Sequence, residues 1–588
     1  MLPASRENPN LLWAFAGAGA GLLVWNAVVH ATAVRRGRTL AVEVALRRQH
    51  YVQACAQSSI FLYWGWYWTD VYDYAYLIAA QLLFAYAFDA LLTWSRRDTY
   101  TLGFGPFPVI FSINLFLWFK PDWFYLQFLM VAVGFAAKEL IRWTKDERRT
   151  HIFNPSSFPL SVFSIVLILT GTTDLTRGVE IATTQLYPPH IYLLIFLVSL
   201  PVQFLFGVAS MTLSAVATTY AFSLAYAAAT GSSFFVESYI PIAVFLGMHL
   251  LFNDPSTSPR TDTGRIVFGV LYGSSIIALF ALLGRAGVPT FYDKLLGVPI
   301  LNLMIQIIDR VARSPMLRRV DLSALVGNLT PSRRNLAYMS VWGVIFVMMQ
   351  VVSGSQITLA RADIMLAQGR IADSITHYRE LVRLEPGNAA GHTKLGFALI
   401  QVGRVQEALP LLRRAIALQP DNPEAHNNLG LALMQVGQTK SAVTSMQRAV
   451  QLRSDYAEGH YNLAHALSAV GDQIAAVAQF REALRVRPAW PTALGALAWL
   501  QATHPDVRDP EEAVHLASRA AELSENRDVA VLDALAAAYA AAGQFEEATR
   551  TAKMAEARAV ASAPALVAGI RARLDLYRAG RPLVIDGP

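Results

Sequence analysis

The amino-acid sequence predicts an all-α protein in two parts, a polytopic membrane domain over residues 1–355 and an α-solenoid over residues 356–565. Hydrophobic residues make up 54% of the chain and charged residues only 15%, against about 25% in a typical soluble domain. The whole net charge of +7 lies in the first of these parts. A period of about 34 residues, typical of stacked helical repeats, begins in the second.

Apolar segments of the first part are candidate membrane spans, because a helix needs about 20 apolar residues to cross a bilayer. Segments 104–119 and 292–309 are the weakest and also fit re-entrant helices. The twelve candidates lie at about 10–29, 51–68, 72–94, 104–119, 122–143, 156–172, 191–207, 208–230, 236–252, 265–284, 292–309 and 336–353.

The Lys and Arg residues between these segments predict the orientation of the chain. One set of alternate loops holds 19 of them and the other holds five, with Arg6 in the smaller set and Arg318 and Arg319 in the larger. Because cytoplasmic loops are enriched in basic residues, we expect an inner-membrane protein whose N-terminus and repeat domain lie outside the cytoplasm. Basic residues placed in this way argue against nucleic-acid binding.

The single cysteine, Cys55, excludes an internal disulfide framework and any cysteine-ligated metal site. The repeat part shows no metal-ligand spacing and no paired carboxylates in a pocket-like context. The sequence therefore predicts no metal site, no catalytic residue and no enzyme activity of the chain on its own.

Glycines mark the repeat of the second part. Gly369, Gly403, Gly437 and Gly471 follow one another at equal steps along the chain. A glycine at this position supplies the turn between two helices. The spacing resembles the tetratricopeptide repeat, a helix–turn–helix unit of about 34 residues.

The resemblance gives the extent of the solenoid. Regular repeats are expected over about 356–490, and degenerate repeats to about 560 after a slip in the Thr503–Pro510 loop. Residues 566–588 are expected to form a C-terminal tail. Small residues at Gly396 and Gly430 are expected to let the two helices of a repeat approach closely.

A stack of such repeats leaves a concave groove lined mainly by the first helix of each repeat. The resemblance implies that this groove binds an extended or helical peptide of a protein partner. The alternative is that the same residues only cap helices and solvate a surface. The residues expected to face the groove are Thr393, Phe397, Gln401, Asn427, Leu431, Gln435, Tyr461 and His465, with Asn428 and Asn462 beside them.

Polar residues inside apolar spans are costly, so each is a functional hypothesis. Asp89 lies within the third span and His249 near the end of the ninth. A carboxylate at the position of Asp89 must be protonated, paired or hydrated. The alternative is an ion pair or hydrogen bond between spans.

Two segments open inside-to-outside spans with a similar pattern. Asn154-Pro-Ser156 precedes the sixth span, and Asp254-Pro-Ser256-Thr257 precedes the tenth. This similarity suggests an internal repeat. Free N–H groups at such a helix start favour an anion, for example a phosphate, whereas the alternative is plain capping of two membrane helices.

These segments, with Gly264 and the run Phe268–Gly273, resemble the RnfD/NqrB-like membrane subunits, in particular a stand-alone type associated with enediyne biosynthesis. The resemblance covers roughly residues 50–310. It implies flavin-mediated electron transfer, with FMN linked through phosphate to a threonine on the outer side. Thr173, in Thr170-Gly-Thr-Thr, would be that threonine. Threonines replace the serine and alanine of the family motif, and the outer loop that follows is short.

The function expected from the sequence is that of an integral membrane protein whose external repeat domain binds a protein partner. Its membrane part would be related to electron-transport subunits and embedded in lipid. The alternatives are a flavin-carrying electron-transfer subunit and a transporter of small molecules or ions. A polytopic glycosyltransferase is disfavoured because no external loop is large enough to carry its catalytic residues.

Overall fold

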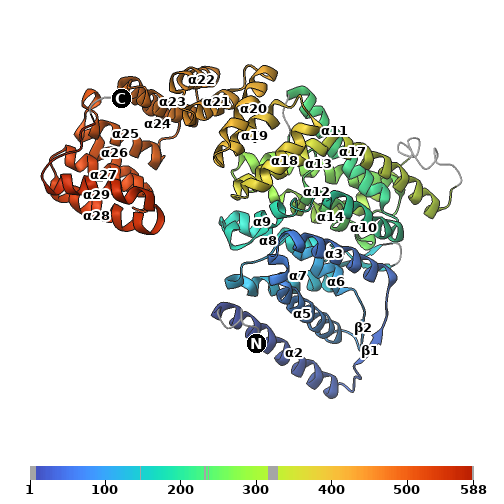
Figure 1. Cartoon of the computed structure of the whole chain (residues 1–588). Coiled ribbons are helices and arrows are strands. Elements are labelled where there is room, and N and C mark those ends of the chain that lie inside the picture. The colour runs from blue at the N-terminus through green and yellow to red at the C-terminus, as the bar shows by residue number, and fades with distance from the viewer. Residues whose placement is uncertain (1–7, 146–147, 231–233, 236–237, 315–328, 586–588) are drawn as a thin grey trace. The chain divides into compact units, whose positions relative to one another are not determined.

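The computed structural model describes residues 8–145, 148–230, 234–235, 238–314 and 329–585 (Figure 1). Arg6, Arg318 and Arg319, which enter the count of loop charges, lie outside the described residues. The chain is mostly α-helical, at 77%. It divides into unit 1, Met1–Arg361, and unit 2, Ala362–Pro588.

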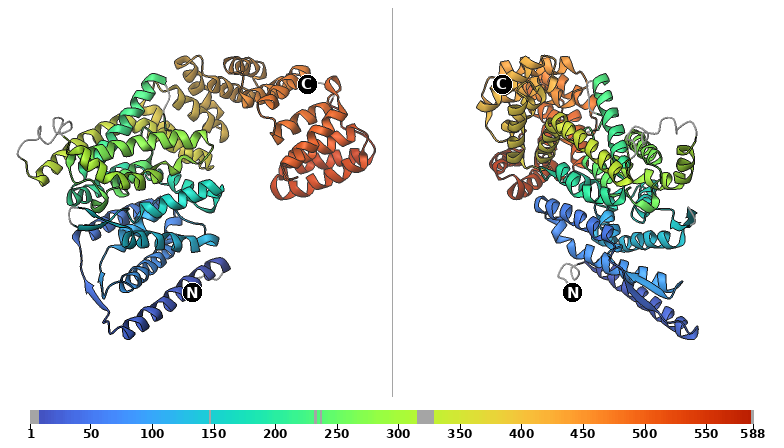
Figure 2. Two further views of the ribbon diagram at one scale, coloured as in Figure 1. Left: turned by 180° about the vertical axis from the view of Figure 1, so that it is seen from behind. Right: turned by 90° about the vertical axis from the view of Figure 1, so that its right-hand side faces the viewer.

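In the described residues of unit 1, helices are joined by connections that include four short strands. α2 packs along α5 and α7 (Figure 2). The elements in chain order are α2 Pro9–Arg35, β1 Ala41–Val44, α3 Arg48–Tyr67, α4 Asp70–Asp73, α5 Ala75–Trp94, β2 Thr99–Leu102, α6 Pro106–Asn114, η1 Pro121–Trp123, α7 Phe124–Leu140, β3 Arg142–Lys145, β4 Arg148–His151, α8 Ser157–Thr170, η2 Thr173–Leu175, α9 Gly178–Thr184, α10 Ile191–Phe206, α11 Ala209–Thr230, α12 Ile242–Leu250, η3 Pro255–Thr257, α13 Asp262–Arg285, η4 Thr290–Tyr292, α14 Asp293–Ala312 and α17 Pro331–Ala367.

The strands correct the all-α expectation. β1 and β2 form a parallel pair, and β3 and β4 form an antiparallel hairpin. All four lie in connections between helices, where short extended segments satisfy their backbone groups by pairing with each other.

Six helical segments of the described chain are long and apolar enough to cross a membrane. They are Pro9–Arg35, Ala75–Trp94, Pro121–Leu140, Asp262–Arg285, Thr290–Ala312 and Pro331–Val352. The twelve-span domain is therefore not shown. Several other expected spans are shorter helices, among them Ser157–Thr170 and Ile191–Phe206.

Two of the expected spans are broken. Segment 104–119 contains only the nine-residue helix α6, and the described residues of segment 236–252, which are 238–252, contain only the nine-residue helix α12. α6 is followed by buried non-helical residues from Leu115 to Phe119. Each helix begins at or after a proline, Pro106 in α6 and Pro241 before α12, and proline is well tolerated in the first turn of a helix.

The helices of unit 1 pack in two similar halves. α3 packs on α6 and α5 packs on α7 in the first half, as α10 packs on α12 and α11 packs on α13 in the second. α3 contacts α10, and α8 contacts α14, across the halves. In this alignment Asn154 precedes the last helix of one half, whereas Asp254 precedes the fourth helix of the other. The two halves share a packing order, but Asn154 and Asp254 do not hold equivalent places in it.

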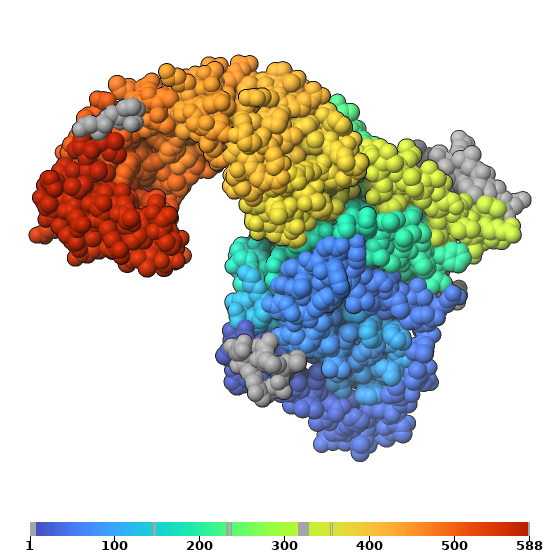
Figure 3. All heavy atoms as spheres, viewed as in Figure 1, coloured from blue at the N-terminus to red at the C-terminus, as the bar shows by residue number. Residues whose placement is uncertain are grey.

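Unit 2 is a stack of helix pairs that curves into an arc (Figure 3). The end of α17 precedes the first turn glycine. The remaining elements are α18 Ile371–Leu384, α19 Ala389–Gln401, α20 Val405–Leu418, α21 Pro423–Gln435, α22 Thr439–Leu452, α23 Ala457–Ala469, α24 Gln473–Val486, α25 Pro491–Thr503, η5 Pro505–Val507, α26 Pro510–Leu523, α27 Val529–Ala541, α28 Phe545–Ser562, η6 Pro564–Leu566 and α29 Val567–Arg578.

The turn glycines adopt the backbone conformation that their position requires. The φ angles of Gly369, Gly403, Gly437 and Gly471 lie between 73° and 88°, in the left-handed region that glycine enters without penalty. At the equivalent place after α25 the chain forms η5 instead, within the Thr503–Pro510 loop. The phase of the repeat is broken there because this loop replaces the glycine turn.

Small residues set the distance between paired helices. A Cβ atom built on Gly396 would lie 2.7 Å from Leu412, and one built on Gly430 would lie 2.5 Å from Met446. Both distances are shorter than real Cβ contacts, so neither position has room for a side chain as packed. This agrees with the close helix approach expected at these positions.

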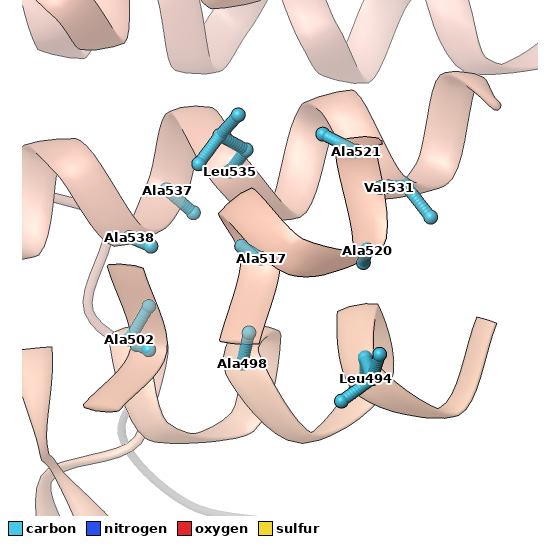
Figure 4. Close-up of a cluster of buried hydrophobic side chains, with 11 residues drawn as sticks. Leu494, Ala498, Ala502, Ala517, Ala520, Ala521, Val531, Leu535, Ala537 and Ala538 are labelled. Atoms are coloured by element: carbon cyan, nitrogen blue, oxygen red, sulfur yellow. The ribbon is translucent and has the colours of Figure 1, made fainter. Parts of the chain in front are cut away.

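Alanine dominates the core of the last repeats. Ala498 of α25, Ala517 and Ala520 of α26 and Ala538 of α27 belong to one buried cluster (Figure 4). Their small side chains allow the three helices to pack closely.

The C-terminal residues belong to the solenoid. The described part of the expected tail, residues 566–585, includes the whole of α29, which packs on α28. Leu583 then packs against the core cluster of Leu574 and Tyr577. The Ile585 N–H donates to the carbonyl of Thr503 at 2.8 Å.

Candidate functional site

The first helices of neighbouring repeats are linked by a row of asparagine amides. Asn462 Nδ2 of α23 donates to Asn427 Oδ1 of α21 at 3.0 Å. Asn427 Nδ2 in turn donates to Asn428 Oδ1 at 3.3 Å. Within the described residues, no hydrogen bond uses Asn428 Nδ2 or Asn462 Oδ1. The row therefore ends in an unbonded donor on Asn428, a residue that is 8% exposed, and an unbonded acceptor on the half-buried Asn462.

An aromatic cluster lies next to this row. The Tyr461 ring is 4.5 Å from His465 and 4.8 Å from Trp490, measured between ring centroids. Phe480 closes the cluster on the side of the second helix, 5.8 Å from Tyr461. Burial raises the pKa of Tyr461, with Asp528 adding to the rise, so this phenol stays neutral and can donate a hydrogen bond.

Ion pairs recur with the repeat at the edge of the first helices. Arg453 pairs with Glu424 at 2.8 Å and lies 3.9 Å from the ring centre of Tyr456. Arg487 pairs with Glu458 in the same way, one repeat later, and stacks on Trp490. Burial, with help from Glu424, raises the pKa of Tyr456 to about 12.

Two further ion pairs neutralise charges on other first helices. Lys394 of α19 pairs with Asp363, and Asp533 of α27 pairs with Arg573 of α29. Arg573 also lies 5.3 Å from the Trp499 ring. Because these charged side chains are paired, the groups available to a ligand near them are polar amides and aromatic rings.

The expected groove residues differ in exposure. Gln435 and His465 are exposed and Tyr461 is half-buried. Thr393 is only 4% exposed and bonds through its hydroxyl to the Ala389 carbonyl, and Asn427 is 2% exposed. Thr393 therefore has little surface for a partner, and Asn427 contributes by aligning the amides on either side of it.

The structure brings together the two proline-containing loops of unit 1. Asn302 of α14 lies between them: its Oδ1 accepts from the Asn154 N–H at 3.1 Å, and its Nδ2 donates to the Thr257 carbonyl at 3.2 Å. His151 Nε2 lies 2.9 Å from Asp254 Oδ2. The sequence pattern pointed to both loops but not to Asn302, which lies in a weakly predicted span.

Asn154 and Asp254 accept hydrogen bonds from backbone N–H groups just after them, at the start of α8 and in the short helix η3. Asn154 Oδ1 accepts from the N–H groups of Ser156 and Ser157, at 3.0 and 3.1 Å. Asp254 Oδ1 accepts from the Ser256 N–H at 2.9 Å. Of the two capped membrane helices that the alternative expects, Asn154 serves the start of α8, whereas Asp254 caps only η3 and Thr261 caps α13. Anion binding at these N–H groups stays a prediction.

The two intramembrane candidates lie apart from these loops. Asp89 is half-buried in α5, near Lys138 and Glu139 of α7. His249 is fully buried, and its Nδ1 lies 2.7 Å from the Phe245 carbonyl. Its ring packs against Phe245 and Trp342.

Thr173 begins the short helix η2, directly after the helix-ending turn at Gly171. It is half-buried, and its carbonyl accepts from the Thr176 hydroxyl at 3.0 Å. No described hydrogen bond uses the Thr173 hydroxyl. A covalent flavin at this position stays a prediction.

Two polar clusters of unit 1 were not expected. Gln81, Asn114 and Gln127 form a buried network of amides between α5, α6 and α7. Arg177 pairs with Asp70 at 2.6 Å and with Glu180 at 2.7 Å, and it lies over the rings of Trp68 and Tyr74. The signal that could have identified the first cluster is the presence of isolated amides within apolar segments.

No group of three metal-ligating side chains occurs in the part of the chain that the structure describes. A small enclosed cavity in unit 1 lies beside Gln81, Asn114, Trp118 and Arg177. Its lining amides are hydrogen-bonded to one another, which makes it a packing feature of the three helices.

Comparison with known proteins identifies the repeats. A family described as TPR repeat matches residues 398–437, and a family described as tetratricopeptide repeat matches residues 423–456 and 457–489. No curated protein matches the chain.

Solved structures resemble the repeat part. MamA is 23% identical over 28% of this chain and 95% of its own, with a TM-score of 0.25. A tetratricopeptide repeat protein from Parabacteroides merdae is 17% identical over 38% and 87%, with a TM-score of 0.31. A thermophilic TPR protein from Thermus thermophilus is 21% identical over 33% and 100%, with a TM-score of 0.27. The C-terminal part of this chain carries tetratricopeptide repeats.

Proposed function

We propose that the chain is an integral membrane protein whose tetratricopeptide groove binds an extended segment of a protein partner. The membrane part would occupy residues 1–355 and anchor the groove outside the cytoplasm. The single observation that supports this function best is the amide row, with its open donor at Asn428 and open acceptor at Asn462.

A peptide backbone has the complementary groups. Its carbonyl can accept from Asn428 Nδ2, and its N–H can donate to Asn462 Oδ1. These asparagine amides would bond to the backbone of the bound peptide and not to its side chains. Extended segments of varied sequence therefore fit the amide row. The neighbouring ring of Tyr461 and the imidazole of His465 offer a surface for an apolar or aromatic side chain of that segment.

The membrane assignment is supported by composition and by helix length. Six described helical segments are long and apolar enough to span a bilayer. The loop charges favour an even number of spans before the repeats. The lipid around these helices would be the second partner of the chain.

Photo-crosslinking in cells tests the groove. A photoreactive phenylalanine replaces Gln435, which is exposed on α21, or the control residue Lys440, which is exposed in the first turn of α22, the second helix of the same repeat. We expect a crosslinked protein from position 435 only, and its loss in Asn428→Ala/Asn462→Ala. Equal adducts from both positions, or an adduct that survives the double substitution, would contradict the proposal.

Flavin-mediated electron transfer is a second candidate function, favoured by the position of Thr173 next to a helix-ending turn. Purified protein on a denaturing gel would then fluoresce as a flavoprotein, and Thr173→Ala would not. Thr172→Ala is the matched control. A dark band from the wild-type chain purified from its own host would reject this candidate.

Passage of a small molecule or ion is a third candidate. Its support is the pair of broken segments at α6 and α12, because interrupted helices in two similar halves form the binding sites of many transporters. Flux measured in proteoliposomes, against liposomes without protein, tests it. Wild-type flux no greater than that of empty liposomes for any solute offered would count against it.

A further inference from the structure

A pair of strands in unit 1 exposes apolar side chains. β1 pairs in parallel with β2, from Ala41 opposite Thr99 to Val44 opposite Leu102 (Figure 1). All four residues of β1 are exposed. Val42, Val44 and Leu46 are 51%, 70% and 65% exposed.

Such a ribbon is poorly suited to water. Parallel strands in proteins are nearly always covered on both faces, and an isolated two-stranded ribbon is at best marginally stable. A surface that provides an apolar environment would cover these side chains.

Four arginines lie at the two ends of the connection that contains β1. Arg35 and Arg36 end α2, and Arg47 and Arg48 begin α3. All four are exposed. Within the described residues, no carboxylate pairs with any of them.

Other arginines in the same region do have partners. Arg38 pairs with Asp98, and Arg97 pairs with Glu139. Arg38 and Arg97 thus form ion pairs within the fold, whereas the other four arginines have side chains available to bind an anion.

The position of Arg47 and Arg48 adds an electrostatic argument. They occupy the start of α3, where the helix dipole and the free N–H groups disfavour a cation and favour an anion. The Arg47 side chain has no acceptor atom and so cannot cap these N–H groups. An anionic group bound there would offset the repulsion.

We propose that the β1–β2 ribbon with Arg35, Arg36, Arg47 and Arg48 is a docking surface for anionic phospholipid, with the valines in the acyl boundary and the arginines on the headgroup phosphates. The four arginines outnumber the one carboxylate of the ribbon, the exposed Glu43, so the net charge is complementary to an anionic headgroup. The ribbon also follows α2, a helix long and apolar enough to span a bilayer. This inference rests on the proposed membrane location, and it adds a specific lipid class and a specific site.

Lipid titration of the intact chain tests it. The purified protein in detergent is mixed with phosphatidylglycerol or phosphatidylcholine, and bound lipids are counted by native mass spectrometry. We expect preferential retention of phosphatidylglycerol. Arg47→Gln/Arg48→Gln should weaken that retention by about fivefold for each arginine removed.

Matched variants separate the surface from general charge effects. Arg413→Gln/Arg414→Gln removes two adjacent exposed arginines from α20 in unit 2 and should leave retention unchanged. Val42→Ser/Val44→Ser keeps the arginines and should also weaken binding, because the apolar contact is lost. Thermal melting of each variant in detergent checks that the fold is kept.

Four results would overturn the inference, three of them from the lipid titration. Those three are equal retention of the two lipids, unchanged retention in Arg47→Gln/Arg48→Gln, and displacement of the lipid by inorganic phosphate, which would indicate a site for a soluble anion. A protein segment bound to the ribbon in place of lipid would overturn it as well. Failure of the membrane location itself would appear differently, as release of the chain from membranes by alkaline carbonate.

Discussion

Asn462 and Asn427, which lie 35 residues apart on the first helices of two neighbouring repeats, are joined by a hydrogen bond of 3.0 Å between Nδ2 and Oδ1. The bond fixes the orientation of both amides. It also determines which of their polar atoms remain available, namely the acceptor of Asn462 and, through Asn427, the donor of Asn428.

The amide row predicts a loss of affinity when it is interrupted. Peptides selected from a random library on the intact chain should bind Asn428→Ala/Asn462→Ala about 10–30-fold more weakly, since each hydrogen bond contributes about 1 kcal/mol. Fluorescence anisotropy with labelled peptides measures the change. Lys440→Ala, on the second helix of the same repeat, should bind as the wild type does, and an equal loss in this control would contradict the prediction.

Binding to the groove should depend little on salt. The ionisable side chains nearest the row are paired, Arg453 with Glu424 and Arg487 with Glu458. Screening weakens interactions between exposed charges, but the proposed contacts are neutral amides and rings. We expect the peptide dissociation constant to change by less than about threefold between low and high NaCl. A tenfold weakening would show that charge recognition dominates.

The glycines of the repeat should differ in the cost of replacement. Gly396→Val forces a side chain against buried Leu412, which should destabilise α19 and α20 by about 2 kcal/mol. Gly403 has open space around it but a φ of 73°, so Gly403→Ala should cost about 1 kcal/mol and Gly403→Asn less. Hydrogen–deuterium exchange of the intact chain measures the local opening. The reverse order would show that packing at Gly396 relaxes easily.

The Asp533–Arg573 pair predicts a dependence on pH. Burial raises the pKa of Asp533, and the Arg573 guanidinium offsets part of that rise. The folded chain then holds the proton more tightly than the unfolded chain. The stability that Asp533 contributes is therefore greatest below the ordinary carboxyl pKa and falls as pH rises through the raised native pKa.

Removing Arg573 should make that fall larger. Arg573→Met leaves a buried carboxylate unpaired and should destabilise the α27–α29 region by about 2–3 kcal/mol at neutral pH, with less loss in acid. Asp533→Asn/Arg573→Met should remove the pH dependence. Hydrogen–deuterium exchange across a pH series, corrected for intrinsic rates, measures both variants. A flat profile in Arg573→Met would contradict the assignment.

The single cysteine makes the sidedness testable. In a Cys55→Ser background, Gln401→Cys places a thiol on an exposed position of α19, and Arg36→Cys places one in the loop after α2. A membrane-impermeant maleimide should label position 401 in intact cells or spheroplasts. It should label position 36 only after permeabilisation. The opposite pattern would place the repeats in the cytoplasm.

The repeat part could be predicted well from the sequence, because each repeat is defined by residues that lie close together along the chain. The equal steps between glycines identified Gly403 and Gly437 as turns, and both have the positive φ expected there. The expected groove positions were less accurate at Thr393, because the same helix face includes both lining and buried sites. Hydropathy alone did not distinguish full helices from the broken segments at α6 and α12, since buried non-helical chain is as apolar as a span.

Contacts between distant segments were the hardest to predict. Asn302 joins the loops at Asn154 and Thr257 across 148 and 45 residues, and no periodicity reports such a pair. The amides of Gln81, Asn114 and Gln127 likewise come together only when three helices pack.

Because the repeats have a regular length, the length of the groove is set by the number of repeat units. Residues 423–456 form one whole repeat unit, and each unit in such a stack relies mainly on its two neighbours. Deleting those residues would join Asn422 to Ala457 and shorten the groove by one repeat unit. It would also remove Asn427 and Asn428, so that only Asn462 of the amide row remains. Binding to this shortened chain would distinguish a partner that needs the full length of the groove from a partner that binds at a single position in it.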